Sequence, residues 1–116
     1  MLNKTSVEVY NDGVLYICDP DTRRTDFNAK VTAKSASELT ERYKLNFAEK
    51  ARREEDFDFA EARDRKLSLK VKCLLREDVT TADQVRIGNI VYSIIKADPS
   101  RRERAMYLYL EEARKL

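Results

Sequence analysis

The amino-acid sequence predicts a mainly β fold with some helix: a small antiparallel β-barrel or sandwich of about seven strands carrying one inserted amphipathic helix. Three observations support this class. Apolar and polar residues alternate in several short runs, which is the pattern of half-buried strands. The two glycines and two prolines fall between the periodic runs, where turns are needed. Some runs are apolar on both sides, as expected for strands in a sheet that hides its edges.

A hairpin is expected to open the chain, with strands at about residues 6–10 and 14–18. A three-residue loop with Gly13 in the left-handed conformation is preferred to a two-residue turn, because it keeps the apolar side chains together. That register places four side chains on one face: Val7, Val9, Leu15 and Ile17. After a turn at Pro20, alternation predicts a further strand at about residues 27–34.

The inserted helix is expected at about residues 36–52. Ser35 and Glu38 fit a capping box, in which two side chains satisfy backbone donors at a helix start. Apolar residues then recur at spacings of three and four, namely Ala36, Leu39, Tyr43, Phe47 and Ala51. This stripe stops at an acidic run, where a loop or kink is expected: Glu54, Glu55, Asp56 and Asp58. Periodicity leaves open whether residues 59–65 add a further helical turn.

Four more strands are expected in the second half, at about residues 67–76, 85–87, 90–97 and 105–111. The first of these has the cleanest alternation and directs Cys73 toward the core. Gly88 and Asn89 suit a two-residue turn between the next two strands. Val91 and Ile95 are apolar on the side opposite their neighbours, so their strand is expected to be covered on both faces.

Composition narrows the function classes. The 23 basic and 21 acidic residues leave a net charge of +2, too balanced to indicate a nucleic-acid partner by itself. Histidine is absent, which excludes Ser-His and Cys-His catalysis and His-ligated zinc. There is no long apolar run for a membrane span and no apolar region typical of a signal peptide. We expect one non-enzymatic, intracellular domain spanning residues 1–116.

No residue pattern indicates catalysis, a metal or a cofactor. The acidic run lacks the spaced ligands and central glycine of a calcium loop, so a solvated or subunit-facing segment is expected. Cys18 and Cys73 carry no signature of an activated thiol and are expected to be reduced. On the last strand, Tyr107 and Tyr109 point away from the expected core, where they either form a binding strip or lie under the helix.

The segment Asp78 to Ile95 carries the most specific pattern in the chain. It reads Asp-Val-Thr-Thr-Ala-Asp-Gln-Val before the second hairpin and ends in Tyr-Ser-Ile-Ile. With a closing strand at Met106 to Glu112, it resembles the small head-closure, or head-tail joining, proteins of tailed bacteriophages, whose pattern is D-[IV]-T-x-x-D-x-V followed by Tyr-x-Ile-Ile. The resemblance covers residues 67–112, whereas the opening hairpin and the long helical insert differ from that family.

This resemblance implies a non-enzymatic virion protein, from a phage or a prophage, that forms a ring of about a dozen copies at the neck. The ring would close the DNA exit channel below the portal and its adaptor, and it would provide the tail-docking surface. The implied partners are other copies, the portal or adaptor, a tail-terminator or tail protein and, transiently, packaged DNA. No membrane is involved, assembly would take place in the bacterial host cytoplasm, and isolated copies can be monomeric.

Three surfaces are expected to serve this role. Subunit contacts are expected on the helical face and the outward tyrosines, at Arg42, Glu49, Arg52, Arg53, Tyr107 and Tyr109. A channel-facing loop that repels DNA phosphates is expected at Glu54, Glu55, Asp56 and Asp58. A basic cluster for a partner or a phosphate is expected at Lys96, Arg101, Arg102 and Arg104. The alternative function is a small β-barrel nucleic-acid-binding module.

Overall fold

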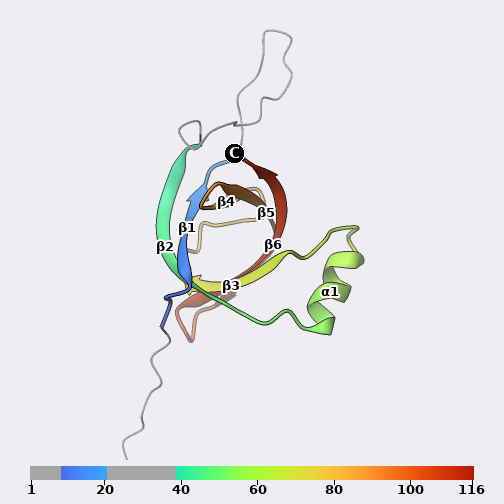
Figure 1. Ribbon diagram of the computed structural model, residues 1–116. Coiled ribbons are helices and arrows are strands. Elements are labelled where there is room, and N and C mark those ends of the chain that lie inside the picture. Colours follow the sequence, from blue (N-terminus) through green and yellow to red (C-terminus); the bar gives the residue numbers. More distant parts are fainter. Residues whose placement is uncertain (1–8, 21–38) are drawn as a thin grey trace, which may run out of the picture.

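The computed structural model describes residues 9–20 and 39–116, which form a closed antiparallel barrel with one helix outside it (Figure 1). The described elements are β1 (Gly13–Cys18), β2 (Glu41–Glu49), α1 (Glu54–Glu61), β3 (Leu69–Leu74), β4 (Gln84–Ile87), β5 (Ile90–Ser100) and β6 (Ala105–Lys115). Around the barrel the strand order is β1-β2-β3-β6-β5-β4. Pairing of β1 with β4 closes the sheet, so that these six strands have no free edge.

The barrel interior is a packed apolar core. Successive side chains of a strand point to opposite faces, and the inward face of each strand is apolar. The buried core comprises Leu15, Ile17, Leu45, Phe47, Val71, Cys73, Val79, Val85, Tyr92, Ile94, Met106, Leu108 and Leu110. Val79 is the one member of this set that comes from the connection between β3 and β4. The interior is therefore filled by side chains, as in other small barrels.

Strand β5 is covered on both faces, as its sequence predicts. Its inward residues, including Ile94, belong to the barrel core. Val91 is buried on the outside against Cys18 and Leu39, and Ile95 is buried on the outside under α1. The pairing of β5 with β6 shifts between Ile94 and Lys96, which marks a bulge at Ile95. The bulge lets two consecutive residues of β5 face outward.

The predicted class, a small β-barrel with one helix, is confirmed, and β3 to β6 form where strands are expected. The turn between β4 and β5 is also confirmed: Ile87 pairs with Ile90 across it, and Gly88 has a φ of 62°. Glycine adopts this left-handed conformation without a steric penalty. Two of the strands run longer than expected, since β5 ends at Ser100 and β6 at Lys115.

The prediction of a helix at residues 36–52 is wrong, because residues 41–49 form strand β2. The segment carries two periodicities at once: Tyr43 and Phe47 fit a helical stripe, and together with Leu45 they also alternate as a strand. In the barrel these three side chains face the core, and β2 pairs with β1 on one side and β3 on the other. Pairing with two neighbours outweighs the weak helical preference of the isolated segment.

The acidic run expected to form a loop is instead the start of α1. Glu54, Glu55 and Asp56 occupy its first turn, where the partial positive charge of the helix N-terminus stabilises acids. Asp56 also accepts a hydrogen bond from the backbone N–H of Arg53 at 2.9 Å, which satisfies a free donor at the helix start. The helix ends by Ala62, and Asp64 follows with a left-handed φ of 56°.

The first strand of the expected opening hairpin is not formed at residues 9 and 10, the part of it that the structure describes. Val9 and Tyr10 are not in a strand, and Val9 is 61% exposed instead of sharing the core face. β1 is paired with β2 and β4, so it has no place for an additional neighbour. The rest of that first strand and the strand expected at residues 27–34 lie outside the described residues. In the part of the chain described, no helix has the length and apolar character needed to cross a membrane.

Candidate functional site

Lysines and tyrosines form a ladder on the outer face of β3, β6 and β5. The strand register sets Tyr109 between Lys70 of β3 and Lys96 of β5, and it sets Tyr107 opposite Lys72. The lysine Nζ atoms lie over the rings, at 5.1 Å from the Tyr109 centroid for both Lys70 and Lys96. Lys72 lies 5.3 Å from the Tyr107 centroid. Each contact is of the cation–π kind.

Helix α1 covers this lysine–tyrosine ladder. Ala60 packs against Ile95 and Tyr109, and the Tyr109 side chain is left only 8% exposed. The Nζ of Lys70 donates to Asp56 Oδ2 at 3.0 Å in a buried ion pair. Helix α1 therefore packs on the lysine–tyrosine ladder. Tyr109 is covered by this packing and does not belong to an open binding strip. Tyr107 is half-buried.

The ion pair under α1 keeps both of its members charged. Burial alone would raise the pKa of Asp56, but the Arg53 N–H and the Lys70 ammonium outweigh burial and hold that pKa below its ordinary value. Burial alone would likewise lower the pKa of Lys70, yet the hydrogen bond to Asp56 keeps it raised. Burial raises the pKa of Tyr109, so its hydroxyl stays neutral at physiological pH.

A second cluster surrounds Arg42, at the start of β2. Its Nη1 donates to Asp19 at 2.7 Å and to Asp83 at 2.9 Å, and its Nη2 donates to the Asp78 carbonyl at 3.3 Å. The hydroxyl of Tyr43 donates to Asp78 at 2.8 Å. This Arg42 cluster fastens the connection between β3 and β4 to the ends of β1 and β2.

Charge sharing stabilises the Arg42 cluster. The hydrogen bonds that Arg42 donates to Asp83, and then to Asp19, raise the pKa of Arg42 further above its ordinary value. The hydrogen bond from Tyr43 lowers the pKa of Asp78 and raises that of the tyrosine. Arg42 was expected at a subunit interface, but its guanidinium is engaged within its own chain. Asp78 and Asp83 are the two acids of the motif that resembles head-closure proteins, and here they hold Arg42.

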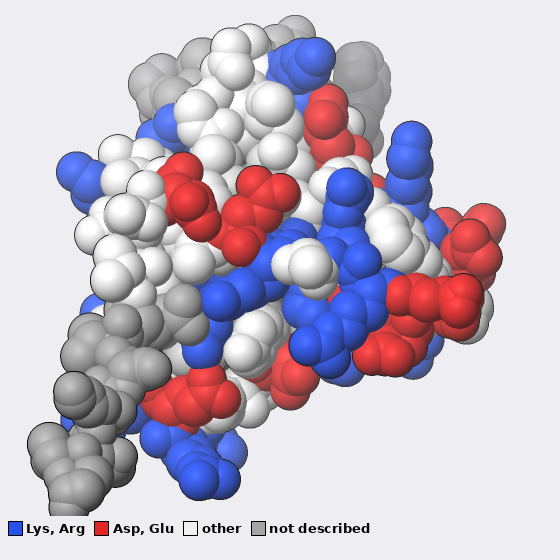
Figure 2. All heavy atoms as spheres, turned by 60° about the horizontal axis from the view of Figure 1, so that its bottom comes forward, with Lys and Arg blue, Asp and Glu red and all other residues white. Residues whose placement is uncertain are grey.

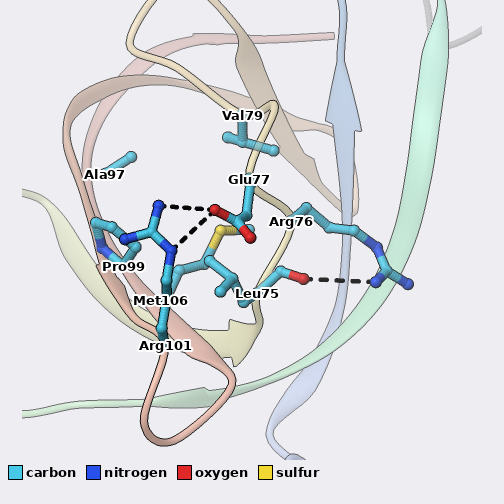
Figure 3. Close-up of a pocket in the computed structure, with 8 residues that line it drawn as sticks. All are labelled: Leu75, Arg76, Glu77, Val79, Ala97, Pro99, Arg101 and Met106. Carbon is cyan, nitrogen blue, oxygen red and sulfur yellow. Dashed lines mark hydrogen bonds and ion pairs between the residues drawn. The ribbon is translucent and has the colours of Figure 1, made fainter.

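A small pocket lies at the end of the barrel where β3 ends and β5 turns into β6 (Figure 3). It measures about 120 Å³. Its walls are Leu75, Arg76, Glu77, Val79, Ala97, Pro99, Arg101 and Met106. Figure 3 shows Arg101 and Glu77 reaching toward each other across the pocket, and they form an exposed ion pair of 2.7 Å. We call this feature the barrel-end pocket.

The expected basic cluster is divided by the fold. Arg101, Arg102 and Arg104 are exposed in the turn between β5 and β6, beside the barrel-end pocket. Lys96 instead belongs to the lysine–tyrosine ladder, where its Nζ lies 4.8 Å from the Phe59 ring centroid. Glu103 from the same turn bonds Lys72 at 2.6 Å. The three arginines of the turn are exposed, and Arg101 is also paired with Glu77.

The remaining expected interface residues lie near α1. Arg53 precedes the helix, and its guanidinium is 3.9 Å from Glu55. The Nη1 of Arg52 donates to the Ser68 carbonyl at 2.9 Å, and its guanidinium lies over the Phe57 ring at 5.5 Å from the centroid. The side chain of Glu49 is exposed on β2. Of these interface residues, Arg52 lines a groove of about 530 Å³, together with Phe57, Glu61, Arg65, Lys66 and Leu67.

The outer face of α1 is acidic. Glu54, Glu55, Asp58 and Glu61 are exposed, whereas Asp56 is turned inward to Lys70. Figure 2 shows acids gathered at the edge of the molecule where α1 lies, next to a field of lysines and arginines. Asp56 is therefore removed from the expected channel-facing set, and the other acids are presented by a helix.

Neither a metal site nor a reactive thiol is assembled by the described residues. No group of three or more Cys, Asp or Glu side chains in this part of the chain is placed to hold a metal ion. Cys18 and Cys73 are both buried and free of disulfide bonds. Burial raises the pKa of Cys73 to about 12, so its thiol stays protonated and inert at neutral pH.

Comparison with models of protein families and with curated proteins finds no match for this chain. Sequence reasoning missed the two interactions that organise the surface, Lys70 with Asp56 and Arg42 with Asp83. A signal for the first was available: Lys70 and Lys72 alternate with core residues on a strand whose facing neighbour carries Tyr107 and Tyr109. Lysines at positions flanked by aromatics are candidates for a covered outer face.

Proposed function

We propose that this protein is a non-enzymatic structural component of the neck of a tailed bacteriophage. In this role, copies form a ring below the portal or adaptor, close the DNA exit channel and present a surface to the tail. The proposal rests on one observation: the segment that resembles head-closure proteins supplies β4, β5 and β6 of a closed barrel whose interior is filled. A filled barrel works through its outer surface.

Asp78 and Asp83, the two acids of the motif, support this proposal because they hold the connection between β3 and β4 in place. Asp78 and Asp83 bind Arg42, and Asp83 also accepts a hydrogen bond from the backbone N–H of Thr80 at 2.9 Å. These bonds fix the connection between β3 and β4 against the barrel. A rigid connection suits a protein that must hold a fixed shape under contact with neighbours. Rigid surfaces lose less entropy when they bind.

The surfaces left for partners are charged. Glu49, Arg52 and Arg53 are exposed and remain candidates for subunit contacts, whereas Arg42 and Tyr109 are engaged within the chain. Charged surfaces of this kind fix the register of a contact and reject wrong partners more than they add affinity. The same property suits a protein that must meet copies of itself, a portal or adaptor, and a tail protein.

Deletion of the reading frame from the genome that carries it tests this function. We expect DNA-filled heads and separate tails by electron microscopy, loss of plaque formation, and recovery of both when the gene is supplied in trans. Purified wild-type virions should contain the chain by mass spectrometry. Normal numbers of joined particles from the deletion strain would overturn the proposal.

A nucleic-acid-binding module is the second candidate, favoured by the groove beside α1. Phe57 is 38% exposed there and lies among Arg52, Arg65 and Lys66, which is the combination that stacks bases and contacts phosphates. Filter binding with single-stranded DNA at low and high salt tests it. A binder of this type loses affinity steeply as salt rises, and it weakens when Phe57 is replaced by alanine.

A further inference from the structure

Exposed apolar side chains mark two separate places on the surface. Among the described residues, the large apolar side chains with high exposure are Val9 at 61%, Leu74 at 42% and Phe57 at 38%. Leu74 ends β3 and Val9 precedes β1, and the start of β1 lies at the barrel end where β3 stops, because Gly13 and Cys73 both pair with Phe47. Phe57 is on α1.

The barrel end bearing Leu74 also holds a ready-made recess. Leu75, Val79 and Met106 give the barrel-end pocket an apolar lining. Its rim carries the exposed pair Arg101–Glu77, with side chains 71% and 61% exposed. Ion pairs at that exposure contribute little stability, so this one yields readily to a competing acid.

The two places have opposite charge. The turn at residues 101–104 carries three arginines and one glutamate, and all four side chains are exposed. Helix α1 carries five acids and no base, and four of the five acids are exposed. Phe57 lies among these acids in the chain, and Arg52, which precedes the helix, lies over one side of its ring at 5.5 Å from the centroid. An apolar anchor within an acidic helix therefore matches an apolar recess with an arginine rim. Protein interfaces usually have few charged residues at their centre and carry their charged residues at the rim.

We propose that α1 of one copy docks on the barrel-end pocket of the next copy, with Phe57 seated in the pocket and its flanking acids paired with Arg101 and Arg102. This inference rests on the proposed function, for which it names the subunit contact. The two surfaces differ, so the contact is head-to-tail and generates a closed ring when its rotation closes. It assigns the α1 acids to a neighbouring subunit in place of the channel-lining role expected from the sequence.

Reversal of charge tests the electrostatic half of the contact. In Glu54→Arg/Asp58→Arg and in Arg101→Glu/Arg102→Glu, self-association measured by sedimentation at low salt should weaken about tenfold or more, because like charges then face each other. An equimolar mixture of the two variants should recover association, because opposite charges face each other at both kinds of contact between the two variants, and only contacts between identical variants repel. A mixture that associates no better than either variant alone would overturn the proposal.

Cross-linking tests the placement of Phe57. A tagged Asp58→Cys chain, which keeps Phe57, is mixed with an untagged Pro99→Cys chain under mild oxidation, since Asp58 is exposed beside Phe57 on α1 and Pro99 lines the pocket and is exposed. The native Cys18 and Cys73 are buried and do not interfere. The matched control replaces Pro99→Cys by Asn46→Cys, an exposed position on β2 that is not part of the pocket. We expect a tagged–untagged disulfide dimer with Pro99→Cys at several times the yield of the control.

Equal yields with Asn46→Cys and Pro99→Cys would overturn the contact, as would the absence of any dimer. This outcome is separable from failure of the proposed function, because cross-linking uses the purified chain and needs no virion. A dimer at the expected positions supports the contact even where deletion leaves joined particles. Conversely, deletion that separates heads from tails supports the neck role even where the dimer is absent.

Discussion

Lys70 reaches from the outer face of β3 to Asp56 in the first turn of α1, and the two side chains form an ion pair of 3.0 Å that is closed off from solvent. The same lysine lies over the ring of Tyr109, and Asp56 also caps the helix start. An eight-residue helix is too short to be stable alone. Its position therefore depends on this ion pair and on the packing of Ala60.

Replacement of Lys70 by methionine should destabilise the protein by about 2–3 kcal/mol, because Asp56 is left charged and without its partner under the helix. Urea unfolding measures this change. The double variant Lys70→Met/Asp56→Leu should lose less stability than the single variant, since no unpaired charge remains. Equal or greater loss in the double variant would contradict the role given to the ion pair.

Acid should loosen α1 before it unfolds the barrel. The folded state holds the pKa of Asp56 below its ordinary value of 3.8, so the stability from this carboxylate is complete above that value and is lost as pH falls through the folded pKa. Amide hydrogen exchange between pH 5 and about pH 3 should report faster opening of α1 than of β5. Lys70→Met/Asp56→Leu should show a smaller change in α1 over the same range.

Arg42 should matter more for stability than Arg101, although both form ion pairs of 2.7 Å. Arg42 is 26% exposed and joins several acceptors, one of which, Asp83, is buried. Its replacement by alanine should cost about 1–2 kcal/mol, because Asp83 loses its cation. Arg101→Ala is the matched control and should change the free energy of unfolding by less than about 0.5 kcal/mol. Similar losses for both variants would contradict this.

Gly13 should tolerate alanine poorly because of the Phe47 ring. A Cβ at Gly13 would lie 3.0 Å from both Cε1 and Cζ of that ring, and Phe47 is packed in the core. We expect Gly13→Ala to cost about 1–3 kcal/mol by thermal unfolding, as for other overpacked sites. The second change Phe47→Leu should relieve part of the added cost, measured against Phe47→Leu alone. Full additivity of the two changes would show that no clash is present.

Both native thiols should resist modification until the protein unfolds. Cys18 and Cys73 are fully buried, and the pKa of Cys73 is raised to about 12. We expect a thiol-reactive dye at pH 8 to label neither cysteine quickly in the native protein and both in guanidinium. The variant Phe57→Cys should react at once, which makes it the positive control. Rapid labelling of the native protein would indicate that the barrel opens.

The strands of the second half were predictable because their side chains alternate, and because β4, β5 and β6 also pair with their neighbours in the sequence across short turns. The turn at Gly88 was predictable because its conformation depends on the two turn residues themselves and not on distant strands. Strand β2 was not predictable, because Tyr43 and Phe47 satisfy two periods and its partners in β1 and β3 decide between them. Local pattern alone carries no information about such distant pairing.

The surface was less predictable than the fold for the same reason. A helix would expose Arg42 and make it a candidate for subunit contacts, whereas strand β2 brings it beside Asp19 and Asp83. Asp56 and Lys70 are separated by the rest of α1 and its connection to β3, and they meet because α1 packs on the outer face of the barrel. The arginines at residues 101–104 lie in the turn between β5 and β6, within the gap between the strands expected at residues 90–97 and 105–111, although β5 itself continues to Ser100.

The filled interior of the barrel has a consequence for any particle that contains it. Residues such as Leu15, Val71 and Leu108 occupy the barrel axis completely, so a single copy is a solid block and cannot be a conduit. In the proposed ring, a passage wide enough for a duplex would be bounded by several copies set side by side. Its bore would then be fixed by how many copies form the ring and how they are tilted.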